Sequence, residues 1–158
     1  MQPPPAVSLR RIVLMGALQL SAIWDLVTTL LGILLILDNL NPVTVSLAVI
    51  GTLIVVAFSF STRLLWQGRR PYGLGILPLA LLRLVWLMAI LMDLWTSLTC
   101  NAWFVGGRTA GDSLALGRLL GQLNPGQRII VVFVTLVTGI SPILVGYLRD
   151  RDLDSWLS

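Results

Sequence analysis

The sequence contains no histidine, lysine or glutamate, and its single cysteine is Cys100. Without histidine, the chain lacks the commonest metal ligand and the usual axial ligand of haem. One cysteine can form neither an intrachain disulfide nor a CxxC site, and a serine nucleophile would have no histidine or lysine base beside it. We therefore expect no metal, no cofactor and no enzymatic activity.

Charge is also scarce, because only 11% of the residues are charged, whereas about 25% is usual for a soluble domain. Hydrophobic residues make up 56% of the chain, and the mean hydropathy is +0.90. This composition is typical of an integral membrane protein surrounded by a lipid bilayer. All of the cations are arginines that mostly flank apolar segments, so the basic pI predicts no nucleic-acid partner.

Four apolar runs predict four transmembrane helices, over residues 12–37, 43–65, 72–98 and 129–148. A helix rises 1.5 Å per residue, so about 20 apolar residues cross the roughly 30 Å hydrocarbon core. The first run is too long for the apolar region of a signal peptide, and it does not end in a small-residue cleavage site. We expect an all-α, polytopic four-helix bundle forming a single membrane domain over residues 1–158, and no internal repeat is apparent.

The arginines near the span ends predict the orientation of the bundle. Four spans place both termini and the connection between the second and third spans on one side of the membrane. That side holds seven arginines and the opposite side holds three: Arg10, Arg11, Arg63, Arg69, Arg70, Arg149 and Arg151 against Arg108, Arg118 and Arg128. Because arginine is enriched in cytoplasmic loops, both termini are predicted to be cytoplasmic.

Arg83 lies near the middle of the third predicted span, where an uncompensated guanidinium costs about 2.5–3.5 kcal/mol. Asp25 lies fourteen residues beyond Arg11, and Arg83 lies thirteen beyond Arg70, so the two side chains are predicted to meet as an intramembrane charge pair. Such a pair could be a structural lock, could line a path for protons or ions, or could be completed by another subunit. Asp93, farther along the third span, is predicted to be a solvated acid at the outer boundary.

Small and polar residues recur at helical spacing on the predicted spans and indicate an internal polar seam. The seam comprises Ser21, Thr28, Thr29, Ser59, Thr135 and Pro142. Pro142 should bend the fourth span, either as a packing feature or as the break that marks a transport site.

The long connection, residues 99–127, carries a segment, 112–123, whose leucines fall on one helical face. This pattern predicts a short amphipathic helix that lies on the outer membrane surface or contacts a partner protein.

Taken together, these features favour an accessory or assembly subunit of a membrane complex that acts without its own chemistry. Its partner would be a larger membrane protein or further copies of the same chain. The alternative is a homo-oligomeric ion channel or proton-linked transporter that uses the predicted pair of Asp25 and Arg83.

Overall fold

A computed structural model describes residues 9–66, 75–107 and 116–157, and these residues are helical apart from short turns and helix ends. The six helices are α1 (Leu9–Leu37), α2 (Pro42–Phe60), α3 (Thr62–Trp66), α4 (Ile76–Val105), α5 (Leu116–Gln122) and α6 (Pro125–Leu157). Four of them, α1, α2, α4 and α6, contain segments long and apolar enough to cross a membrane. The prediction of an all-α bundle with four such helices is confirmed, and the chain is an integral membrane protein.

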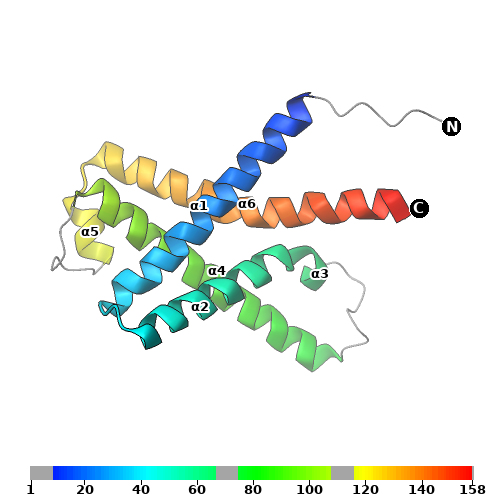
Figure 1. Cartoon of the computed structure of the whole chain (residues 1–158), viewed down its shortest axis with the longest axis horizontal. Coiled ribbons are helices and arrows are strands. Elements are labelled where there is room, and N and C mark those ends of the chain that lie inside the picture. The colour runs from blue at the N-terminus through cyan, green and yellow to red at the C-terminus, as the bar shows by residue number, and fades with distance from the viewer. Residues whose placement is uncertain (1–8, 67–74, 108–115, 158) are drawn as a thin grey trace.

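The four long helices form two hairpins that pack against each other (Figure 1). α1 and α4 run in the same direction and cross, while α2 and α6 run back the other way. The start of α1 and the end of α6 lie at one end of the bundle, with α3 near them, and α5 lies at the other end. α1 makes its most extensive contacts with α4 and α6, so these three helices enclose the interior.

The bundle has an apolar outside and a largely polar inside. Leucine, isoleucine and valine side chains are exposed along all four long helices, as expected for surfaces that face lipid. The buried side chains are instead mostly small or hydroxylated, and small residues let helices in a membrane approach closely. The most extreme approach is at Gly32 of α1, where an added Cβ would overlap the backbone carbonyl of Thr96 on α4.

The turn between α1 and α2 is closed by specific backbone and capping contacts. Asp38 has φ 47°, a left-handed conformation that asparagine and aspartate tolerate better than most residues, and it ends α1. Asn41 then caps α2: its side chain accepts from the Thr44 amide at 2.9 Å, and its own amide donates to Thr44 Oγ1 at 3.1 Å. Pro42 occupies the first helical turn, where its missing N–H has no cost.

The third long helix is displaced along the sequence from its prediction. α4 begins at Ile76 and continues to Val105, whereas the predicted span was 72–98, of which residues 72–74 lie outside the described part of the chain. α6 similarly begins at Pro125, so the connection between the last two long helices is shorter than the predicted 99–127.

Of the predicted amphipathic segment, residues 116–123 are described, and α5 covers Leu116–Gln122. Leu119 and Leu123 are buried against Ala102 of α4 and Val131 of α6. The apolar face of α5 therefore packs in large part on the bundle itself, because a short helix gains more from a site between two long helices than from the membrane surface.

Candidate functional site

A pair of carboxyl groups lies in the middle of the bundle, one from each of the two parallel helices. Asp25 of α1 and Asp93 of α4 are 2% and 1% exposed, and their carboxyl groups lie close enough to interact directly. Two carboxylates buried side by side would repel each other, which favours a state in which one of them is protonated. The arrangement is therefore suited to an acid pair that shares a proton.

Hydroxyl groups from both helices surround the acid pair. Thr29 Oγ1 donates to Asp93 Oδ1, and Thr29 also lies 3.1 Å from Ser97 Oγ. Thr28 Oγ1 donates to the Asp25 carbonyl oxygen at 3.0 Å and lies 3.0 Å from Ser97 Oγ. All three hydroxyl residues are essentially buried. The network links α1 and α4 at the depth of the two acids, and we call these five residues, Asp25, Thr28, Thr29, Asp93 and Ser97, the carboxyl centre.

α6 closes the carboxyl centre from the third side. A Cβ placed on Gly139 would lie 3.8 Å from Oδ1 of Asp25, an ordinary contact distance, and 3.2 Å from Leu94 Cδ2, so this turn of α6 packs beside the acid. The same carboxyl oxygen is buried and has no hydrogen-bond partner among the described groups. Ser21 lies one helical turn before Asp25 on α1, and its Oγ accepts a hydrogen bond from Ser141 of α6 at 2.8 Å.

The remaining residues of the predicted seam are also inside the bundle. Thr135 of α6 accepts a hydrogen bond from Asn101 Nδ2 of α4 at 2.9 Å. Ser59 of α2 and Pro142 of α6 are fully buried, and Ser59 Oγ has no partner among the described groups. All six predicted seam residues therefore lie between helices, with Ser21 half-buried and the others buried.

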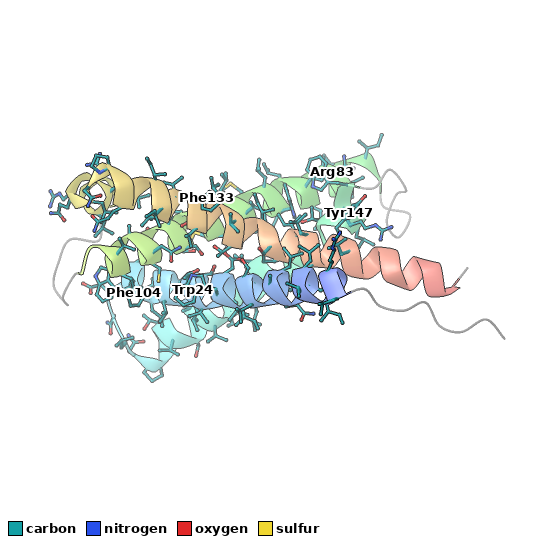
Figure 2. The ribbon with its side chains drawn as sticks, turned by 90° about the horizontal axis from the view of Figure 1, so that it is seen from above. Trp24, Arg83, Phe104, Phe133 and Tyr147 are labelled. Carbon is teal, nitrogen blue, oxygen red and sulfur yellow. The ribbon has the colours of Figure 1, made fainter. Side chains whose placement is uncertain are left out.

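The predicted pairing of Asp25 with Arg83 is wrong. Arg83 Nε donates to the Leu65 carbonyl oxygen at 3.1 Å, and its guanidinium carbon lies 4.9 Å from the centre of the Trp66 ring. Figure 2 shows Arg83 toward the end of the bundle where α1 begins, whereas Trp24, the chain neighbour of Asp25, lies nearer the other end.

Two physical reasons account for the error. The depth of Arg83 was counted from Arg70, but α4 begins only at Ile76, so Arg83 lies about 10 Å from the helix start and can reach the polar boundary. Asp93 is ten residues farther along, about 15 Å deeper, and it reaches the level of Asp25. The prediction that Asp93 is a solvated boundary acid is wrong for the same reason.

Arg83 belongs to a second cluster, which fixes α3 against the bundle. Arg83 contributes its contacts with Leu65 and Trp66. In addition, Trp86 Nε1 of α4 donates to Thr62 Oγ1 of α3 at 2.9 Å. The Trp66 and Trp86 rings meet edge to face, with centroids 5.4 Å apart. These groups secure the end of the α2–α3 segment to α4 at the level where aromatic and arginine side chains favour the membrane interface.

The predicted seam omits the buried polar residues of α4, among them Thr96, Ser97 and Asn101. The predicted third span has no polar face and ends at residue 98, so the prediction does not relate these residues to Asp93. Within the described residues, no group of three or more histidine, cysteine, aspartate or glutamate side chains could hold a metal ion. No protein family, curated protein or solved structure matches this chain.

Proposed function

We propose that this chain is a small proton-linked membrane transporter in which the carboxyl centre takes up and releases the coupling proton. The observation that carries the proposal is the burial of Asp25 and Asp93 side by side in a membrane bundle, where Thr29 links the two helices through Asp93 and Ser97. Ionisable groups are expensive at this depth and commonly mark proton relays. Two acids in contact are a natural proton carrier, because loss of the shared proton would leave two repelling charges.

The closed geometry supports a carrier rather than an open channel. Asp25, Asp93 and the three hydroxyl residues beside them are nearly inaccessible. Two open surface hollows, of about 260 and 430 Å³, lie near the end of α2 and near the start of α1, and neither is lined by residues of the carboxyl centre. Release of a proton would therefore require the helices to separate, and α6 has the means to bend beside the site at Pro142.

The competing proposal is an accessory or assembly subunit, in which the same contacts only hold the helices together. The complete burial of the carboxyl centre is the observation that favours it, because buried polar networks can fix helix register without any exchange. A homo-oligomer is compatible with either proposal. The transporter and the accessory subunit are both proposed to have cytoplasmic termini, and reporter fusions at residues 1 and 158 would test this orientation.

Reconstitution in liposomes separates the two proposals. An imposed pH gradient should drive proton flux through the wild-type protein, measured with an enclosed pH-sensitive dye. Asp25→Asn and Asp93→Asn should each lower the flux at least ten-fold, because an amide cannot release the proton. Asp38→Asn is the matched control, since Asp38 is exposed in the α1–α2 turn and asparagine tolerates its positive φ.

Equal flux through the wild type and both centre variants, at matched incorporation, would reject the transporter. Stoichiometric co-purification with a larger membrane protein, together with an absence of flux, would support the accessory subunit instead.

A further inference from the structure

Two short sequence patterns occur twice in the chain. Residues 25–30 read DLVTTL and residues 93–98 read DLWTSL, so four of the six positions are identical and Thr29 is matched by Ser97. Residues 40–42 and 123–125 both read LNP. The first pattern repeats after 68 positions and the second after 83, and the difference is accommodated by the segment that contains α5.

The structure gives the repeated patterns equivalent places. DLVTTL and DLWTSL lie on the parallel helices α1 and α4, while each LNP leads into α2 or α6. Asn124 caps α6 as Asn41 caps α2: its side chain accepts from the Gln127 amide at 2.8 Å, and its amide donates to Gln127 Oε1 at 3.0 Å. The two hairpins therefore share both the central acid and the reciprocal cap.

The buried positions of the two hairpins also coincide. On α1 and α4, five pairs separated by 68 positions are all buried: Asp25 and Asp93, Thr28 and Thr96, Thr29 and Ser97, Gly32 and Cys100, Ile33 and Asn101. On α2 and α6, four pairs separated by 83 positions are all buried: Ala48 and Val131, Thr52 and Thr135, Val55 and Thr138, Ser59 and Pro142. Every described buried position of α1 and α2 is therefore matched by a buried position of α4 or α6.

Superposing one hairpin on the other would place α1 on α4 and α2 on α6. In Figure 1, α1 and α4 run in the same direction and cross, and α2 and α6 both run back the other way, as copies related by a rotation about the length of the bundle would. The sequence-based prediction contains no internal repeat, whereas these paired patterns and buried positions favour one. Repeats of this parallel kind occur in membrane transporters, whose binding sites lie between the repeats near the middle of the bilayer.

We propose that the chain consists of two copies of one helical hairpin and that the carboxyl centre is a composite proton site built from two equivalent half-sites. Each half-site supplies one aspartate and, four residues later, one hydroxyl: Asp25 and Thr29 from one copy, Asp93 and Ser97 from the other. One exchangeable proton is held between the two acids, and either acid can carry it. This inference deepens the proposed function. It rests on that function only for the claim that the proton is used in transport.

The surroundings of the two acids are consistent with such exchange of roles. Thr29 and Ser97 face the carboxyl groups from α1 and α4, and Gly139 faces Asp25 from α6. The described contacts of the acid pair include no arginine, so no fixed positive charge makes one acid the permanent anion. Asp25 Oδ1, which is buried without another partner, is free to accept or carry the proton.

Infrared difference spectroscopy of the whole reconstituted protein, with isotope-labelled aspartate, tests the equivalence without requiring transport. For the wild type, the difference between spectra recorded in neutral and alkaline buffer should contain one band of a protonated carboxyl group. Asp25→Asn and Asp93→Asn should each shift or remove that band, and to the same extent. Asp38→Asn should leave it in place. A missing band in the wild type, or a band altered by only one of the two variants, would overturn the inference.

A double variant that keeps both acids covers the case in which removal of an acid prevents folding. Thr29→Ser together with Ser97→Thr exchanges the two hydroxyl residues between the half-sites and should preserve the band. Loss of the band in this folded double variant would show that the half-sites are not equivalent. An intact band pattern with no proton flux would keep the composite site and reject the transporter, so the two proposals fail separately.

Discussion

Gly32 of α1 lies directly against the backbone of Thr96 on α4, and a Cβ at Gly32 would come within 3.0 Å of Thr96 Cα while overlapping the carbonyl group. The obstacle is backbone rather than a flexible side chain, so the two helices would have to move apart to accept any larger residue. This contact is one helical turn from Thr28 and Thr29, and it therefore sets the distance between the two halves of the carboxyl centre.

The Gly32→Ala variant should be destabilised by about 1–3 kcal/mol, the usual cost of overpacking a well-packed site. Gly16→Ala is the matched control on the same helix, because nothing lies within 4 Å of a Cβ at Gly16. Cys100 is the single cysteine and is fully buried, so its rate of reaction with a maleimide dye during heating reports opening of the bundle. Equal rates for the two variants would contradict the close contact.

The repeated caps predict matched losses of stability. Asn41→Ala and Asn124→Ala each remove an asparagine cap, which costs about 0.5–2 kcal/mol, and the two losses should agree if the hairpins are copies. Asn39→Ala, in the same turn as Asn41 but at an exposed position, should have little effect. Thermal unfolding followed by circular dichroism in detergent would measure all three. A loss confined to one of the two capping positions would count against equivalent turns.

The hydrogen bond between Asn101 and Thr135 should contribute only modestly, although it lies inside the bundle. Interhelical hydrogen bonds in membranes are worth about 0.6 kcal/mol on average and about 1.7 kcal/mol at most. A double-mutant cycle with Asn101→Ala, Thr135→Ala and the combined variant should give a coupling energy in that range. Strictly additive losses would mean that the two side chains do not interact.

The sequence predicts the helices well and their internal partners poorly. Long apolar runs identify four spans because side chains that face the hydrocarbon core of the membrane are almost all apolar. The seam residues can be predicted because small and hydroxyl side chains are enriched where helices contact each other. The partner of Asp25 was misidentified because opposite charges were assumed to attract. A protonated acid pairs as readily with another acid, and the sequence does not display protonation.

The apolar run also does not define the start of α4. A helix that began at Tyr72 would carry Arg83 toward the bilayer centre and Asp93 toward the boundary, whereas α4 begins at Ile76. The repeat of DLVTTL in DLWTSL contained the needed information, because it aligns Asp93 with Asp25 directly. The displacement of α5 onto the bundle could not be read from its own sequence, since the pocket that receives Leu119 is formed by α4 and α6.

Arg83 should be important for the position of α3 and unimportant for the proton site. In Arg83→Lys, the planar contact with Trp66 is lost, and the contact is worth about 0.5–1 kcal/mol. We expect amide hydrogen exchange in residues 62–66 to rise about two- to five-fold, the factor that this free energy gives when local opening limits exchange. Arg118→Lys, at an exposed position on α5, is the matched control and should leave exchange in residues 62–66 unchanged.

The same variant separates the observed arrangement from a charge pair of Asp25 with Arg83. Because Arg83 lies about 15 Å along α4 from Asp93, Arg83→Lys should leave the protonated-carboxyl band at its wild-type position. An arginine bound to Asp25 would instead hold that acid as an anion, and its replacement would change the band. A shift of the band in Arg83→Lys, with exchange in residues 62–66 unaltered, would therefore place Arg83 at the carboxyl centre and contradict the structure.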